Sequence, residues 1–188
     1  VVDRAIEPDQ IALISFERQQ ATYEEEWRLA ATDIIPEDER GTRVADFLPL
    51  DRLDDTLIDQ LNMRHRLQAF YRELSTGESR KLMVLTALLE EAELLICDNP
   101  FDSLDQGTVQ ALSETFRLAV ASGVAVILLL SNRSDIPEWV EKFGHVEAGL
   151  LTAFAGPRDA QLAQLETGIA TGAIVQPGIP EDAIRLEA

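Results

Sequence analysis

The 188 residues include 34 Asp and Glu against 16 Lys and Arg, which gives a formal net charge of −18. A surface this acidic repels phosphate backbones, so direct nucleic-acid contact is not expected. The single cysteine, Cys97, excludes an intrachain disulfide, and no apolar run reaches the roughly 18 residues of a membrane span. We therefore expect a cytoplasmic protein whose role at any membrane, such as the inner face of the plasma membrane, is peripheral.

The apolar pattern predicts strands and helices in alternation along the chain. They are a strand at 11–16, a helix at 23–31, one or two helices within 54–71, a helix at 78–92, a strand at 94–97, a helix at 105–122, a strand at 124–130, a hairpin around Gly149 and a helix at 158–165. The strands at 94–97 and 124–130 are apolar throughout, as parallel strands covered on both faces are. This order predicts an α/β fold with a parallel sheet. Gly, Ala, Pro and acids dominate 167–188, which we interpret as a linker.

The first chemical motif is Leu74-Ser75-Thr76-Gly77-Glu78, at the start of a predicted helix. Exposed backbone N–H groups and the helix dipole make such a start an anion site. Ser75 adds a hydroxyl donor, and Gly77 lets the backbone come close to a phosphate. The alternative is an ordinary capping box, since Glu78 follows Ser75 by three residues.

Three further polar segments follow the two apolar strands. Asp98 and Asn99 end the first strand, where an acid at the mouth of an α/β sheet is placed to hold Mg²⁺. The segment Ser103-Leu104-Asp105 comes next, and its alternative interpretation is a helix N-cap. Asn132 follows the second strand in a polar loop. Each segment alone is weak evidence for a nucleotide site.

Together, in this order, the four segments resemble the back half of an ATP-binding-cassette (ABC) nucleotide-binding domain. Residues 74–78 resemble the family signature, usually Leu-Ser-Gly-Gly-Gln, and 94–98 the Walker B strand. Ser103-Leu104-Asp105 resembles the D-loop, and Asn132 stands where the family usually has a switch histidine. The residues of these motifs further resemble those in the first half of tandem ABC proteins that are named for molybdenum transport or photorepair.

The resemblance implies a truncated P-loop NTPase core with a parallel sheet and a helical subdomain. The predicted divisions are a central strand and Q-loop region at 1–19, with Phe16 or Glu17 at the glutamine position, a helical subdomain at 20–76, the rest of the core at 77–166, and the linker at 167–188 toward a second ABC half. Trp27, Phe47 and Phe70 are candidates to line a docking groove for a membrane permease. The alternative for each aromatic is a place in the core.

Three departures from the family concern catalysis. The sequence has no Gly-x-x-x-x-Gly-Lys-Ser/Thr phosphate loop, because neither Lys81 nor Lys142 follows a glycine. Asn99 replaces the usual catalytic Glu, and an amide cannot accept a proton as a general base. Asn132 can donate a hydrogen bond but cannot carry charge. We expect the chain alone to be inactive as an ATPase.

The resemblance implies ATP and Mg²⁺ as cofactors, with Asp98 as the metal ligand. Because ABC halves share their sites, the signature at 74–78 is expected to act in trans on ATP held by a second half. The function expected is the ATP-binding component of a molybdate transport system, with a permease as a further partner. The alternative is a soluble tandem ABC ATPase with a regulatory or repair-related role.

Overall fold

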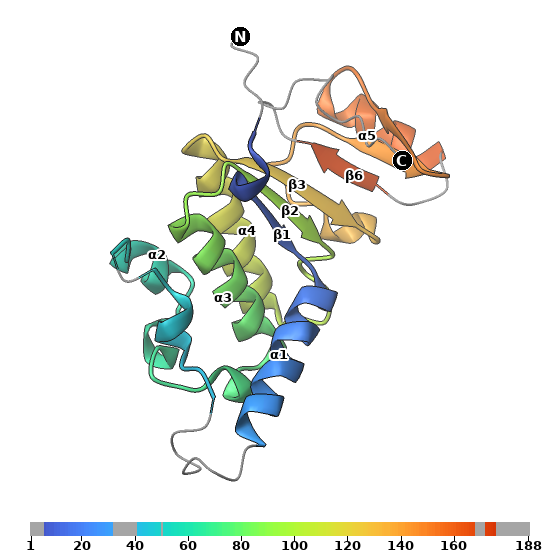
Figure 1. Ribbon diagram of the computed structural model, residues 1–188. Coiled ribbons are helices and arrows are strands. Elements are labelled where there is room, and N and C mark those ends of the chain that lie inside the picture. The colour runs from blue at the N-terminus through green and yellow to red at the C-terminus, as the bar shows by residue number, and fades with distance from the viewer. Residues whose placement is uncertain (1–5, 32–40, 50, 168–171, 176–188) are drawn as a thin grey trace. The chain divides into compact units, whose positions relative to one another are not determined.

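A computed structural model describes residues 6–31, 41–49, 51–167 and 172–175 of the chain. The chain divides into two compact units (Figure 1). The first, here called the sheet unit, comprises Val1–Leu13, Ala92–Pro100 and Phe116–Ala188. The second, the helical unit, comprises Ile14–Glu91 and Phe101–Thr115. The predicted division differs, since it assigned residues 77–91 and the D-loop to the core rather than to the helices.

The described residues form a sheet of six strands in the order β1-β2-β3-β6-β4-β5. β2 (Leu94–Asp98) and β3 (Ala125–Leu130) are parallel neighbours, with Leu94 opposite Ala125 and Asp98 opposite Leu129. Both strands are largely buried, which confirms the parallel, fully covered strands predicted from their apolar sequences. Because parallel strands end at the same edge, the polar residues that follow β2 and β3 meet there.

The predicted linker contributes a strand to this sheet. β6 (Gly172–Val175) pairs antiparallel with four residues of β3 and with two of β4 (Gly144–Glu147). The sheet is therefore mixed, and the side of β3 away from β2 has a hydrogen-bonding partner within the chain. Four residues rich in Gly and Ala carry too weak a period to be recognised as a strand. The rest of 167–188, apart from Thr167, lies outside the described residues.

The hairpin predicted around Gly149 is present. β4 and β5 (Leu150–Ala153) pair antiparallel, and Ala148 and Gly149 both have positive φ, of 50° and 79°. Two central residues with positive φ make the tight turn that matches strand twist. α5 (Arg158–Thr167) follows, and its buried Gln161 accepts the N–H of Phe143 at 3.0 Å. Gln161 thereby ties α5 to the segment that leads into β4.

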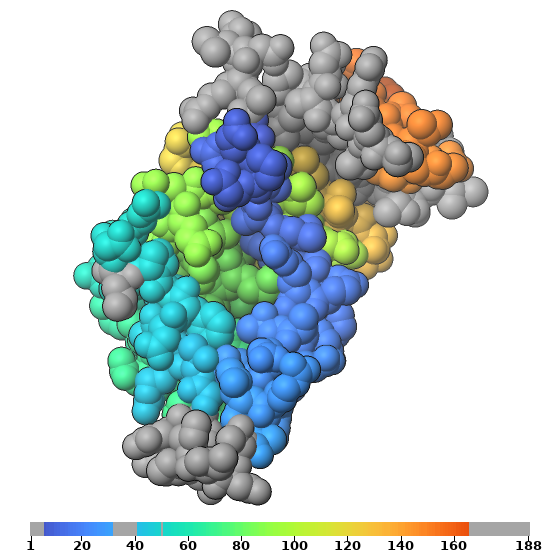
Figure 2. Space-filling view, viewed as in Figure 1, coloured from blue at the N-terminus to red at the C-terminus, as the bar shows by residue number. Residues whose placement is uncertain are grey.

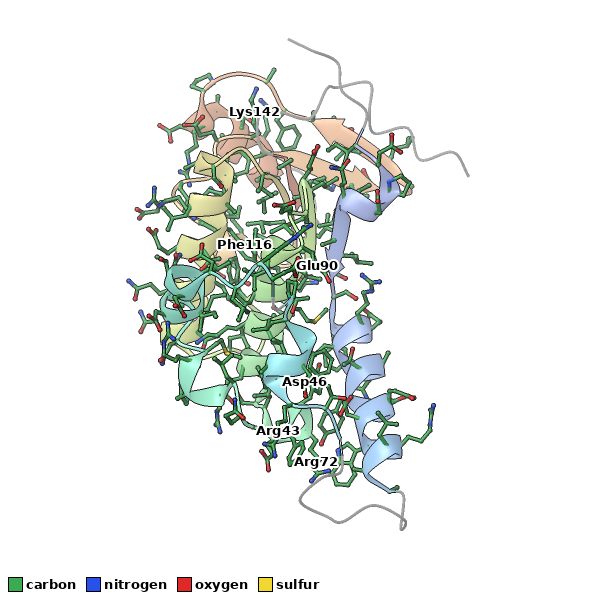
Figure 3. The ribbon with its side chains drawn as sticks, turned by 60° about the vertical axis from the view of Figure 1, so that its left-hand side comes forward. Arg43, Asp46, Arg72, Glu90, Phe116 and Lys142 are labelled. Carbon is green, nitrogen blue, oxygen red and sulfur yellow. The ribbon has the colours of Figure 1, made fainter. Side chains whose placement is uncertain are left out.

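In the part of the helical unit that the structure describes, the chain forms four helices and short 3₁₀ turns. They are α1 (Phe16–Ala30), α2 (Asp55–Gln60), α3 (Thr76–Leu89) and the first ten residues of α4 (Gln106–Ala121). Its core contains aliphatic side chains and Tyr71. Arg43 and Arg72 lie at one end of the unit, with their guanidinium groups over the Phe70 ring at 4.6 and 4.9 Å (Figure 3).

One sequence-based boundary, at the start of α1, was wrong. β1 (Ile11–Ile14) ends before Ser15, whose hydroxyl accepts the N–H of Arg18 and caps α1, so the helix begins seven residues earlier than expected. The segment 54–71, where one or two helices were predicted, holds α2 and a 3₁₀ turn at Arg64–Arg66, and a further 3₁₀ turn follows at Tyr71–Glu73. Among the described residues, no helix is long and apolar enough to cross a membrane.

Candidate functional site

Asp98 and Asn99 lie at the carboxyl end of β2, and both are half-buried. Asn99 has a φ of 42°, in the left-handed region that Asn tolerates better than most residues. Its side-chain Nδ2 donates to the Asp98 carboxylate at 2.9 Å, and its Oδ1 accepts the Ser131 N–H at 2.8 Å. Its backbone N–H donates to the Leu129 carbonyl at 2.8 Å. Asn99 therefore joins the ends of β2 and β3, a structural task that the sequence did not reveal.

Asn132 is exposed and lies one residue beyond Ser131, the partner of Asn99. It has an extended backbone and precedes a 3₁₀ turn at Arg133–Asp135, whose last N–H donates to the Asn132 carbonyl at 3.2 Å. Sequence order placed Asn132 at the same sheet edge as Asp98, and the parallel pairing of β2 with β3 brings the two strand ends together. Its role as a switch residue remains a prediction.

The segment 74–78 forms the N-terminus of α3 and contains the capping box. The Ser75 hydroxyl accepts the Glu78 N–H at 3.2 Å, and the Glu78 carboxylate accepts the Ser75 N–H at 2.9 Å. Leu74 is buried, whereas Ser75 and Thr76 are exposed. The capping box does not exclude an anion site, because it leaves the Ser75 hydroxyl hydrogen free to donate to a ligand.

Glu78 stands where the family has a neutral glutamine, and a neighbouring cation compensates its charge. The Arg66 guanidinium Nε donates to the Glu78 carboxylate at 2.6 Å. Partial burial raises the pKa of Glu78, but the Ser75 N–H and the Arg66 guanidinium together lower it by more, so the net shift of the pKa is downward. The Glu78 carboxylate is thus ionised, and the positive charge of Arg66 balances its negative charge within the helical unit. Arg66 is a partner of the candidate site that the sequence did not indicate.

Gly77 lies against the D-loop of the same unit. A Cβ on Gly77 would meet Thr108 Cγ2 at 3.1 Å and Leu104 Cδ2 at 3.5 Å. Close packing within the chain therefore favours glycine here, in addition to any approach of a phosphate. The structure brings together two motifs, the signature and the D-loop, that are about 25 residues apart in the chain.

Asp105 of the D-loop caps α4, as its alternative interpretation predicted. Its carboxylate accepts from the Thr108 hydroxyl at 2.7 Å and from the Thr108 N–H at 3.0 Å. These bonds, the hydroxyl bond first, hold the pKa of Asp105 below its usual value. Ser103, with a φ of 59°, makes the turn that precedes this cap.

A buried polar network holds the signature helix and also escaped the sequence analysis. Gln19 of α1 donates to the Thr76 carbonyl at 3.0 Å and to the Ser79 hydroxyl. Arg80, only 3% exposed, donates to Gln19 Oε1 at 3.3 Å and to the Asp102 carbonyl at 3.2 Å. Phe16 and Glu17, the predicted glutamine positions, are exposed in the first turn of α1. A glutamine does face α3, but it is Gln19.

The donor set at Asp98 fits one kind of metal site. Among the residues that the structure describes, no group of three or more His, Cys, Asp or Glu side chains is placed to hold a metal ion. One carboxylate beside an amide is too few ligands for a metal cage held by protein alone. Mg²⁺ that is held mainly by nucleotide phosphates needs only one or two carboxylates. Asp98 therefore fits a nucleotide-borne magnesium ion.

Comparison with curated sequences finds relatives among ABC transporter proteins. The chain is 34% identical over 161 residues to the ABC transporter ATP-binding protein ModF of Escherichia coli, covering 82% of this chain and 32% of that protein. It is 25% identical to the Fe(3+) ions import ATP-binding protein FbpC of Pseudomonas fluorescens, over 78% of this chain and 44% of that one. It is 29% identical to the lipoprotein-releasing system ATP-binding protein LolD 1 of Rhodopirellula baltica, over 50% and 42%. The chain therefore spans less than half the length of each of these relatives.

Solved structures share the fold. An ATP-binding subunit of an ABC transporter matches 87% of this chain with a TM-score of 0.53 at 24% identity, over 65% of that subunit. The cbiO1 subunit from Clostridium perfringens, part of an ABC transporter complex, matches 85% with a TM-score of 0.55 at 19% identity, over 61% of its length. No protein-family model matches the sequence.

Proposed function

We infer that this chain, which belongs to the ATP-binding-cassette family of ATP-binding domains, supplies its signature motif to ATP that a second ABC half holds. The observation that carries this inference is the arrangement of the signature cluster, residues 74–78 with Arg66. Ser75 and Thr76 are exposed, and Gly77 packs on the D-loop. Arg66 neutralises Glu78, so that the carboxylate does not repel a phosphate. A helix N-terminus of this kind favours an anion.

The chain's own catalytic position is proposed to be impaired. Asn99 is bonded to Asp98 and to the Ser131 N–H, and it cannot act as a general base. This feature favours a half that completes its partner's site over a half that hydrolyses ATP by itself.

Magnesium and ATP are the cofactors that this function requires. Bound Mg²⁺ would neutralise phosphate charge during transfer. On this chain, Asp98 is the residue proposed to hold the ion, in the one-carboxylate manner that a nucleotide-borne magnesium ion needs. Asn132, exposed beyond β3, is proposed to donate a hydrogen bond to the nucleotide where a histidine would otherwise do so.

Molybdate import is the transport process that we propose. Support comes from the 34% identity to ModF, together with motif residues that resemble those of tandem molybdenum-transport proteins. Other relatives are named for the import of iron ions and the release of lipoproteins, and they do not support molybdate. In this role the chain would work with a second ABC half and a membrane permease. The hydrogen-bonded Asn99 also favours the alternative, a regulatory half that does not hydrolyse ATP.

Nucleotide binding by a reconstituted pair tests the proposed function. A fluorescent ATP analogue is titrated into a separate ABC half that carries a phosphate loop, with and without this chain. The expected result is no binding to the chain alone and tighter binding to the pair, with the gain lost in Ser75→Arg. Ser134→Arg, in an exposed turn outside the signature, is the matched control and should keep the gain. Equal affinity with and without the chain would refute the role in trans.

A further inference from the structure

The carboxylate of Glu78 is committed to bonds within the helical unit. Its Oε1 accepts the Arg66 Nε–H at 2.6 Å, and its Oε2 accepts the Ser75 N–H at 2.9 Å. The Glu78 side chain is only 18% exposed. A carboxylate also repels phosphate, so this last residue of the signature has little to offer a nucleotide. A ligand at this position is therefore expected to contact the neighbours of Glu78 instead.

Arg66 is a neighbour that keeps hydrogen-bond donors for a ligand. It belongs to the 3₁₀ turn Arg64–Arg66, which follows α2, and Figure 2 shows the segment around α2, in cyan and turquoise, bordering α3, in green. The Arg66 side chain is 36% exposed, twice the exposed fraction of the Glu78 side chain. Among the hydrogen bonds of the described residues, none involves the two Nη atoms of Arg66. These atoms carry four N–H groups, and a guanidinium can bind phosphate through two of them in parallel.

Lys81 adds a second positive charge on the same side of α3. It follows Glu78 by three residues and Gly77 by four, so it lies one turn further along the face that these residues share. Long side chains on a helix lean toward its N-terminus, which directs the Lys81 ammonium group toward the signature. Lys81 is 8% exposed, and within the described part of the chain its ammonium group forms no ion pair or hydrogen bond.

The cluster of Glu78, Arg66 and Lys81 lacks an anion. One carboxylate stands against two cationic groups, although the chain as a whole has a formal net charge of −18. A buried ammonium group without a partner is costly, because burial removes the water that stabilises its charge. The carboxylate of Asp105, in the adjoining D-loop, is bonded to Thr108 instead. An anionic ligand would supply the missing charge.

We propose that Arg66 and Lys81 make the signature of this chain a cation-lined phosphate site, in which the Arg66 guanidinium contacts the phosphates of ATP held by the second half. Glu78 holds the guanidinium in place. Lys81 is a positioning residue, since its charge offsets the Glu78 carboxylate and leaves the charge of Arg66 for the ligand. The proposal rests on the proposed function and deepens it by naming a phosphate-contacting residue outside the segment 74–78.

Titration of a fluorescent ATP analogue into the reconstituted pair tests the proposal. Arg66→Gln should weaken binding to the pair about tenfold and reduce its dependence on salt, because a charged contact is lost. Arg66→Lys keeps the charge without the planar fork and should recover part of the loss. Lys81→Met keeps the side-chain length without the charge and should weaken binding several-fold. The matched control is Arg64→Gln, since Arg64 is two residues away and pairs with Asp55 and Asp59.

Inorganic tripolyphosphate, added to the chain alone at millimolar concentration, tests the site without the second half. We expect a saturable shift of the Arg66 Nε–H signal in NMR spectra, assigned by its absence in Arg66→Gln, and a weaker shift in Lys81→Met. Urea midpoints of the same variants report any loss of structure separately.

Three results would overturn the proposal. They are unchanged affinity of the pair in Arg66→Gln, an equal loss in Arg64→Gln, and an Arg66 signal that does not respond to tripolyphosphate. Unchanged affinity in Lys81→Met would overturn the role of Lys81. If the wild-type pair gains no affinity for ATP while tripolyphosphate still shifts the Arg66 signal, the phosphate site stands and the proposed role in trans falls.

Discussion

The signature cluster in the helical unit and the Asp98–Asn99 cluster in the sheet unit are held together by different chemistry. In the first, a capping box, an ion pair and a buried arginine hold an exposed helix N-terminus in place. In the second, the side-chain amide of Asn99 joins the ends of β2 and β3. It also bonds to Asp98, the carboxylate that the motifs assign to metal. The first arrangement leaves donors for a ligand, whereas the second uses them for structure. A half that serves its partner's site needs only the first.

Loss of Arg80 should lower the free energy of unfolding more than the other changes below, because buried Arg80 supports the signature cluster. Arg80→Ala leaves Gln19 Oε1 and the Asp102 carbonyl without this donor in a buried site. We expect a loss of about 2–4 kcal/mol in the free energy of unfolding, measured by urea denaturation. Arg64→Ala, which removes an exposed arginine paired with Asp55 and Asp59, should change the midpoint little. Similar losses in both variants would contradict a supporting network under the signature.

The contact between signature and D-loop can be broken and restored. Gly77→Ala places a methyl group 3.1 Å from Thr108 Cγ2, and we expect a loss of about 1–2 kcal/mol in stability from overpacking. Thr108→Ser removes that methyl group and keeps the hydroxyl that bonds Asp105. The double variant should therefore regain most of the loss in the same denaturation measurement. No recovery would show that Gly77 is required for another reason.

In the sheet unit, Asn99→Asp tests whether the amide serves structure. The new carboxylate keeps the acceptor for the Ser131 N–H but replaces the donor to Asp98 with a like charge. We expect a loss of about 1–2 kcal/mol at pH 7. Thermal unfolding at pH 7 measures the difference from wild type. A variant as stable as wild type at pH 7 would leave Asn99 without its structural task.

The smallest effect is expected from the ion pair at Glu78. Because its folded-state pKa is lowered, Glu78 stabilises the fold above its unfolded pKa of about 4.3, and this contribution is lost as the pH falls through the folded-state pKa. Arg66→Ala should remove part of it, roughly 0.5 kcal/mol at pH 7 after screening by solvent. The difference from wild type should vanish near pH 2. Unfolding midpoints followed between pH 2 and pH 7 check this, and a constant difference would assign Arg66 to packing instead.

The sequence predicted the parts of the fold that local patterns determine. The apolar runs of β2 and β3 and the turn at Gly149 were all confirmed, because a strand buried on both faces and a two-residue turn each have a local signature. β6 was missed, since a short Gly- and Ala-containing strand is formed by its neighbours rather than by its own propensity. The start of α1 was also missed, since its exposed aromatic residues hide the usual amphipathic pattern.

For the candidate site, motif spacing named the residues but not their partners. Ser75, Gly77, Asp98 and Asn99 lie at chain positions that a motif can identify. Their partners come from far along the chain. Arg66 lies 12 residues from Glu78, Gln19 lies 57 from Thr76, and Thr108 lies 31 from Gly77. A single sequence carries no signal for such contacts. Capping at Ser75 and Asp105 was foreseen, since caps depend on residues three positions apart.

The most direct test of the account compares two variants in one turnover assay. This chain is mixed with an ABC half that carries a phosphate loop and a catalytic glutamate, and ATP hydrolysis is measured for wild type, Ser75→Arg and Asp98→Ala. We predict that Ser75→Arg abolishes the turnover gained by mixing, because it blocks the signature, whereas Asp98→Ala leaves most of it. If Asp98→Ala abolishes turnover and Ser75→Arg does not, the chain works through its own sheet-unit site, and the assignment of the two regions is wrong.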